Sequence, residues 1–119
     1  MNARRTIIAA AALLGAGLAV GAPAATAGTT SPAGLHVVGT AHGQDVYGWN
    51  AVGGTSWYSI QLDGHQVRKD LKRTLQVQVY DLYLYCHALP GHSYTLSIVA
   101  VDAAGNRSAP SEGVVMTVA

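Results

Sequence analysis

The residues whose types best suit chemistry gather in one short stretch, where Cys86 and His87 are adjacent and His92 follows five residues later. A cysteine beside a histidine is the pairing used by thiol nucleophiles, and both side chains ligate zinc. Successive residues of a strand point to opposite faces, so Cys86 and His87 cannot converge on one ion or substrate in the strand expected here. No zinc-framework spacing occurs among the five histidines and the single cysteine. The pattern predicts surface histidines and no metal site.

Two other kinds of catalytic site lack their pattern. The sequence contains no Gly-x-Ser-x-Gly, the strand-turn-helix element that exposes the nucleophile of serine hydrolases. Acid–base catalysis by paired carboxylates needs two acids that converge, and the acids here fall mostly in expected turns or loops. We therefore expect a protein that is not an enzyme, with no catalytic residues and no cofactor.

An outward row of aromatic side chains is the candidate ligand-binding site. If residues 82, 84 and 86 face the core of a strand, then Tyr83, Tyr85 and His87 line its outer face about 7 Å apart. Such a row could stack on sugar rings or cover a partner protein. The alternative is that these tyrosines serve cross-strand packing alone, and the opposite register would bury them.

A basic cluster is the second candidate for binding. It consists of Arg68, Lys69, Lys72 and Arg73, with Asp70 among them. The cluster could touch an anionic cell-wall polymer, or it could be a solvated loop whose charge Asp70 dilutes.

The first 27 residues read as an export signal rather than as part of the fold. Two arginines precede an uncharged apolar run from Ile7 to Val20, and small residues end the segment at Ala27. This order is typical of a secretory signal peptide cleaved before Gly28, and the run is shorter than the roughly 20 residues of a membrane span. The general secretory route is favoured over the twin-arginine route that Arg4-Arg5 suggests. We expect a secreted protein with no membrane attachment after cleavage.

The remaining 92 residues form one domain of modest size. Their five basic and six acidic residues give a net charge of −1, so nucleic-acid binding has no electrostatic support. A single cysteine cannot form an internal disulfide, so the fold must depend on its hydrophobic core. Cys86 is expected either to be buried or to pair between chains.

Short runs rich in valine, tyrosine and threonine predict an all-β protein of six or seven strands. Strands are expected over 35–39, 45–51, 57–62, 94–101 and 114–118, and Asp63-Gly64 predicts a tight hairpin whose return strand starts at 65–67. The segment 68–88 contributes the rest. Its apolar alternation changes phase near Tyr80-Asp81, which predicts a bulge or short turn within a strand, and Val67, Leu71 and Leu75 allow one helical turn before it.

Four motifs together resemble a fibronectin type III domain, of the kind found in secreted bacterial polysaccharide-degrading enzymes. They are Trp49 at the end of the second strand, Tyr-x-Ile-x-Leu-Asp-Gly from Tyr58 to Gly64, Pro-Gly-x-x-Tyr from Pro90 to Tyr94, and "VAVDAAGNRSAPS". The resemblance spans 32–119, after a leader over 28–31, and implies an immunoglobulin-like sandwich of two sheets. It departs from the family at Ala88 and Asp45, where leucine and an apolar residue are preferred.

The resemblance also implies structural roles for particular residues. Tyr94 is expected to form a tyrosine corner, in which its hydroxyl bonds to nearby backbone. The other expected structural residues are Trp49, Tyr58, Ile60, Pro90, Gly91 and Gly105.

The resemblance implies a secreted, single-domain, non-catalytic binding or spacer module that contacts polysaccharide or cell-wall polymer. The alternative is an extracellular protein–protein interaction or structural module that self-associates through an edge strand or through Cys86. Both interpretations leave the ligand or partner open, because fold alone does not supply it.

Overall fold

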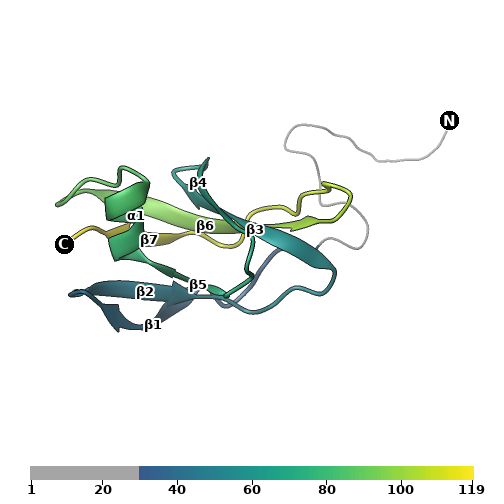
Figure 1. Cartoon of the computed structure of the whole chain (residues 1–119), viewed down its shortest axis with the longest axis horizontal. Helices are drawn as coiled ribbons and strands as arrows, with labels where there is room; N and C mark the ends of the chain where they lie inside the picture. Colours follow the sequence, from purple (N-terminus) through teal and green to yellow (C-terminus); the bar gives the residue numbers. More distant parts are fainter. Residues whose placement is uncertain (1–29) are drawn as a thin grey trace, which may run out of the picture.

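A computed structural model describes residues 30–119, and the predicted signal peptide lies outside these described residues. The described chain forms seven strands and one short helix (Figure 1). They are β1 (His36–Ala41), β2 (Gln44–Gly48), β3 (Thr55–Leu62), β4 (His65–Asp70), β5 (Gln76–Gln78), α1 (Val79–Tyr85), β6 (Ser93–Asp102) and β7 (Val114–Thr117).

The strands form two antiparallel sheets that face each other. One has the order β1-β2-β5 and the other has the order β4-β3-β6-β7. The chain crosses from the first sheet to the second after β2, returns after β4 and crosses again after α1 (Figure 1). The prediction of an all-β, two-sheet sandwich of about seven strands is confirmed.

The core lies between the sheets and is built by strand alternation. Tyr58, Ile60 and Leu62 of β3 point inward and are buried, in register with the inward residues of β6. Trp49 follows β2 and packs edge-on against Tyr58, with ring centroids 5.5 Å apart. Fully burying one such large side chain contributes about 1.5–3 kcal/mol, so this interior stabilises a domain that has no disulfide among its described residues.

The predicted hairpin at Asp63-Gly64 is present between β3 and β4. Both residues have positive φ, 51° and 83°, as a two-residue type I′ turn requires. The carboxylate of Asp63 also accepts a hydrogen bond from the backbone N–H of Thr95 at 2.8 Å. The turn is therefore tied to β6 as well as to its own strands.

The Pro90-Gly91 corner joins α1 to β6 and fixes the end of the chain. The Tyr94 hydroxyl accepts a hydrogen bond from the backbone N–H of Leu89 at 2.9 Å, which is the geometry of a tyrosine corner. Gly91, with φ of 77°, donates its N–H to the carbonyl of Val118 at 2.8 Å. Pro90 itself is exposed.

The loop after β6 is a turn held by one carboxylate. Asp102 accepts hydrogen bonds from the backbone N–H groups of Ala104 and Asn106 and from the side-chain amide of Asn106. These bonds, those of Asn106 foremost, hold the pKa of Asp102 below its ordinary value. Gly105 supplies the positive φ of 88° that the turn needs.

The segment 68–88 differs from the prediction. Residues 79–85 form the helix α1 rather than a strand, so the change of apolar phase marks the start of a helix and not a bulge. Val79 and Leu82, three residues apart, share the buried side of this helix. The helical turn allowed by Val67, Leu71 and Leu75 is absent, because Val67 belongs to β4 and Leu71 is 65% exposed.

Candidate binding site

The predicted tyrosine row does not exist as a strand face. Tyr83 and Tyr85 both lie on α1, where residues two apart point about 200° away from each other. They are 40% and 72% exposed. His87 follows the helix, exposed and with a positive φ of 63°.

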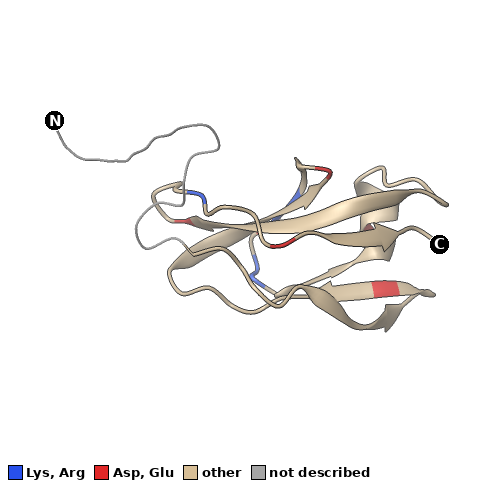
Figure 2. Ribbon diagram, turned by 180° about the vertical axis from the view of Figure 1, so that it is seen from behind, with Lys and Arg blue, Asp and Glu red and all other residues tan. Residues whose placement is uncertain are grey.

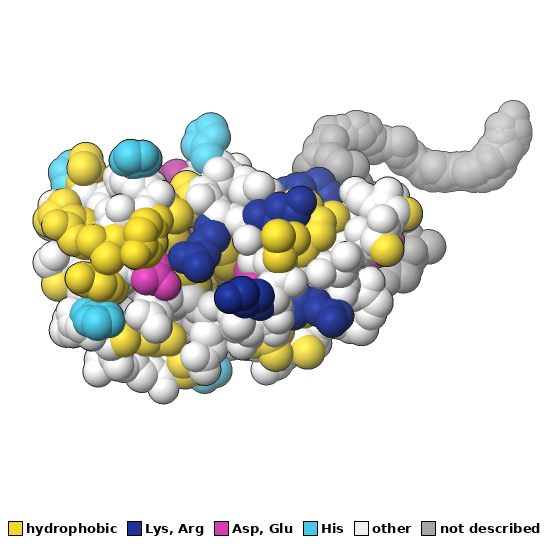
Figure 3. Space-filling model, in the orientation of Figure 1, with side chains coloured by type: hydrophobic (Ala, Val, Ile, Leu, Met, Phe, Trp, Pro, Cys, Tyr) yellow, Lys and Arg dark blue, Asp and Glu magenta, His cyan; other side chains and the backbone are white. Residues whose placement is uncertain are grey.

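The helix instead carries a set of apolar side chains, which we call the α1 patch: Tyr80, Tyr83, Leu84 and Tyr85. Tyr80, Tyr83 and Leu84 share one side of the helix, whereas Tyr85 points away from Tyr83, toward the side of Asp81. The rings of Tyr80 and Tyr83 are 6.3 Å apart, and Tyr80 also stacks on His42 of the β1–β2 turn at 4.2 Å. Figure 3 shows hydrophobic side chains gathered over α1, next to charged ones. The α1 patch therefore carries the exposed aromatic area expected from the sequence, in a different geometry.

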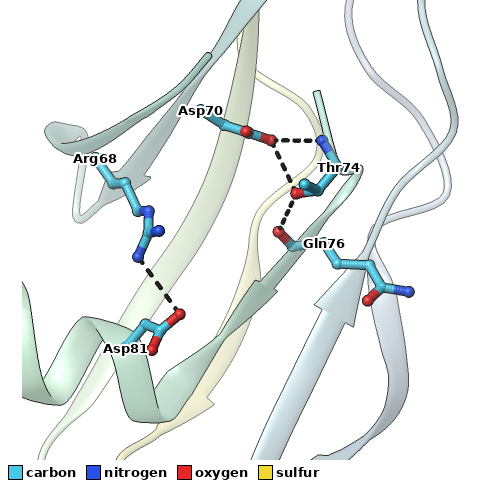
Figure 4. Close-up of polar contacts among 5 residues, drawn as sticks. All are labelled: Arg68, Asp70, Thr74, Gln76 and Asp81. Carbon is cyan, nitrogen blue, oxygen red and sulfur yellow. Dashed lines mark hydrogen bonds and ion pairs between the residues drawn. The ribbon is translucent and has the colours of Figure 1, made fainter. Parts of the chain in front are cut away.

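A groove with both polar and apolar lining adjoins the α1 patch, between the free edge of β4 and the start of α1. This β4–α1 groove has a volume of about 480 Å³, and its lining includes Arg68, Gln76, Gln78 and Asp81. An ion pair joins β4 to α1, with Arg68 Nη1 3.6 Å from Asp81 Oδ2 (Figure 4). Both side chains are part-exposed, so the pair contributes little to stability and its hydrogen-bonding groups remain open to a ligand.

A buried carboxylate shapes the far end of the β4–α1 groove. Asp70 accepts hydrogen bonds from the backbone N–H groups of Lys72 and Arg73. It also accepts hydrogen bonds from the backbone N–H and the hydroxyl of Thr74 (Figure 4). The connection it holds contains two non-glycine residues with positive φ, Arg73 at 54° and Leu75 at 63°. Asp70 thus fixes the backbone that positions the Lys72 and Arg73 side chains.

The predicted basic cluster is distributed over a strand and the following connection. Figure 2 shows the basic segments on β4, on the β4–β5 connection and in the loop before β7. Lys69 lies over the ring of Trp57 with Nζ 4.4 Å from its centre, and Arg107 lies 5.7 Å from the same ring. Trp57 and Arg107 were not singled out from the sequence. The one sequence feature that could have identified Trp57 is its position in the alternation of β3, where it falls on the side opposite to Tyr58 and Ile60.

Cys86 ends α1 and is half-buried. Burial raises the pKa of its thiol, opposed by the nearby charge of Arg68. Among residues 30–119, no three His, Cys, Asp or Glu side chains come together as a metal-binding set. In the same part of the chain, no helix is both long and apolar enough to cross a membrane.

The sheet order together with the tyrosine corner defines a fibronectin type III-like, immunoglobulin-like sandwich. No protein-family description matches the sequence, and no curated protein matches it either.

Two larger proteins of solved structure contain the same fold. The spore cortex lytic enzyme SleM of Clostridium perfringens is similar over 75% of this chain, with a TM-score of 0.54 and 15% identity. The family 28 exopolygalacturonase of Yersinia enterocolitica is also similar over 75%, with a TM-score of 0.51 and 18% identity. The chain covers 28% and 20% of those two proteins. FN3tt mut is similar over 72% of this chain and 89% of its own, with a TM-score of 0.47 and 22% identity.

Proposed function

We propose that this protein is a secreted, non-catalytic module that binds polysaccharide through the α1 patch and the β4–α1 groove. One observation carries the proposal. Asp81 lines the groove and Tyr85 follows it by one turn of α1, so an exposed aromatic ring adjoins polar groups there; Figure 3 shows hydrophobic and charged side chains next to each other over α1.

This combination suits a sugar ring. The apolar face of a pyranose packs on a tyrosine ring, while its hydroxyls exchange hydrogen bonds with charged and amide side chains. Tyr85 supplies a ring beside the groove, and Tyr83 supplies a second ring on the other side of α1. Arg68, Asp81 and Gln78 supply the donors and acceptors. Because the Arg68–Asp81 pair is part-exposed and long, a sugar hydroxyl can replace it at small cost.

Two further observations support an extracellular accessory role. The sequence begins with the pattern of a secretory signal peptide. The two larger proteins of similar fold are a cortex-lytic enzyme and an exopolygalacturonase, and the chain covers 28% of the first and 20% of the second. A sandwich of this size attached to such an enzyme suits binding or spacing rather than catalysis.

The test is retention of residues 28–119 on insoluble cellulose, chitin and isolated cell wall. We expect the unaltered protein to be retained on at least one of them, and the double variant Tyr83→Ala/Tyr85→Ala to be lost from it. Val115→Ala is the matched control, because Val115 is 70% exposed on β7 and belongs to neither the α1 patch nor the lining of the groove. Absence of retention on every material, or equal retention of the double variant, would overturn the proposal.

A protein partner is the second candidate occupant, favoured by exposed apolar side chains at the edge strand β1. Val37 and Val38 are both nearly half exposed there. Self-association through this edge predicts a concentration-dependent dimer in sedimentation, and pairing through Cys86 predicts a dimer that is lost on reduction.

A further inference from the structure

We propose that a second pocket on this protein binds the carboxylate groups of an acidic polysaccharide. The pocket, which we call the Thr55 pocket, lies between residues 51–55 and the connection 72–75 and has a volume of about 370 Å³. The inference rests on the proposed polysaccharide-binding function and names the chemical class of the polymer.

The charge of the Thr55 pocket is uncompensated. Lys72 and Arg73 line it, and no acidic residue does. The one ion pair among residues 30–119 joins Arg68 to Asp81, so neither of the two pocket cations has an acidic partner there. A pocket with two cations and no anion attracts a negatively charged group.

Asp70, the acidic residue nearest to Lys72 and Arg73 in the sequence, does not line this pocket. The carboxylate oxygens of Asp70 are occupied by the backbone N–H groups of residues 72–74 and by the Thr74 hydroxyl. These bonds hold the backbone of Lys72 and Arg73 from the side of the β4–α1 groove. Asp70 is therefore a support for the two cations rather than their partner.

The pocket also contains a buried polar atom without a partner. Thr55 is 7% exposed, and its hydroxyl makes no hydrogen bond among residues 30–119. Buried hydroxyls normally find a partner. Because this oxygen is shielded from solvent, the Thr55 side chain must rotate toward the pocket before it can donate to a ligand oxygen. The backbone carbonyl of the same residue already accepts a bond from Arg73 Nη1 at 3.0 Å.

This bond orients the guanidinium of Arg73. Arg73 has a positive φ, and its side chain bridges to the 51–55 loop, which leaves its other N–H donors in the pocket region. A guanidinium presents N–H donors in a planar fork that fits a carboxylate. Gly53 and Gly54 complete the rim without side chains, and Gly54 adopts a φ of 78° that disfavours any other residue.

The pocket continues the groove of the proposed function. Lys72 lines both the Thr55 pocket and the β4–α1 groove. Figure 3 shows Lys and Arg side chains spread across the same face as the hydrophobic area over α1. A linear polymer can therefore pack sugar rings on the α1 patch, cross the groove and place an acidic substituent against Lys72, Arg73 and the Thr55 hydroxyl.

The experiment compares two polymers with the same sugar backbone, one anionic and one neutral: polygalacturonate and its fully methyl-esterified form. Affinity for each is measured by isothermal titration at low ionic strength. We expect the acid form to bind more tightly. Lys72→Gln is expected to weaken its binding about tenfold, as loss of one charge-assisted hydrogen bond does. Thr55→Val keeps the side-chain shape, removes the hydroxyl and is expected to weaken binding as well.

Arg107→Gln is the matched control, because it removes one positive charge from a residue outside both the groove and the pocket. Its effect on the affinity is expected to be less than twofold. Equal losses in Lys72→Gln and Arg107→Gln would overturn the pocket in favour of general charge attraction. Equal affinity for both polymers would overturn it while leaving polysaccharide binding intact.

Failure of the proposed function has a different signature. If neither polymer binds and the tyrosine variants behave as the unaltered protein on every insoluble material, polysaccharide binding itself is overturned. Amide chemical shifts then test the pocket directly, with galacturonic acid monosaccharide as the probe. Changes in the amide chemical shifts of Thr55 and Arg73 that disappear in Lys72→Gln would support the Thr55 pocket as a carboxylate site. Absence of these changes would overturn it.

Discussion

Replacement of Asp70 by alanine is expected to destabilise the domain through the connection between β4 and β5. Four hydrogen bonds end on this carboxylate, at 3.1, 3.1, 3.2 and 3.3 Å. A hydrogen bond to a charged group contributes about 1.5–3 kcal/mol where water is excluded. Lys72, Arg73 and Thr74 are exposed, so water replaces most of the lost bonds, and we expect a total cost of about 2 kcal/mol.

The magnitude converts to a measurable change in melting temperature. For a domain of 60–100 residues, 1 kcal/mol corresponds to about 4–8 °C, so Asp70→Ala should lower the Tm by about 8–16 °C. Asp70→Asn keeps one acceptor oxygen and should cost about half as much. Urea unfolding followed by tryptophan fluorescence measures the free energy of unfolding independently of calorimetry.

Glu112→Gln is the control for Asp70, because Glu112 is exposed and its carboxylate accepts no hydrogen bond among residues 30–119. It should leave the Tm within about 2 °C, as surface substitutions do. If Asp70→Ala has the same Tm as Glu112→Gln, the carboxylate does not hold the β4–β5 connection. Our account of how Lys72 and Arg73 are positioned is then refuted.

Three further outcomes are expected. Tyr94→Phe leaves the N–H of Leu89 without its acceptor and should cost about 1 kcal/mol in urea unfolding, whereas Tyr85→Phe, on the exposed side of α1, should cost nothing measurable. Asp102, whose pKa is lowered in the folded chain, should titrate by carbon NMR with a midpoint below 3.8. Its contribution to stability is present above pH 3.8 and is lost as the pH falls through the lowered pKa. A midpoint at or above 3.8 would contradict the turn geometry. The thiol of Cys86, whose pKa is raised by burial, should be alkylated more slowly than glutathione at pH 8 in the folded protein. In denaturant it should be alkylated at the same rate as glutathione. Equal rates in the folded state would contradict its burial.

Local turn chemistry made much of the fold predictable. Asp63-Gly64 can be interpreted from the sequence because positive φ at two successive positions is a strong local requirement. The alternation of Tyr58, Ile60 and Leu62 predicted the inward face of β3, because a strand between a core and solvent has period two. These signals depend on neighbouring residues alone.

The helix α1 could not be predicted in the same way. Valine, tyrosine and leucine favour strands, and Leu82 and Leu84 alternate as a strand does. Tertiary packing decided otherwise, because a helix buries Val79 and Leu82 together while leaving Leu84 and Tyr85 in solvent. The tyrosines are therefore exposed, as one of the two registers predicted, but they lie on a helix and not in a row.

The candidate binding surfaces were only half visible in the sequence. Arg68, Lys72 and Arg73 stood out as a charge cluster, but nothing local connected them to Asp81 or to Thr55. Those contacts depend on how the β4–β5 connection folds back over the edge of the sandwich. Such long-range geometry leaves no periodic trace in the chain.

The two ends of the described chain lie at opposite ends of β6, and this has a mechanical consequence. Ser31 bonds to the carbonyl of Ala109, beside the last residues of β6, whereas Val118 bonds to His92, just before its first. Ala109 lies beside residues 99–100 of β6, so at about 3.3 Å per residue roughly eight residues separate these points by about 25 Å. Tension applied to the two ends would run along the strands and load their hydrogen bonds in shear, all at once rather than one by one. The domain is therefore expected to resist extension when its two ends are pulled apart.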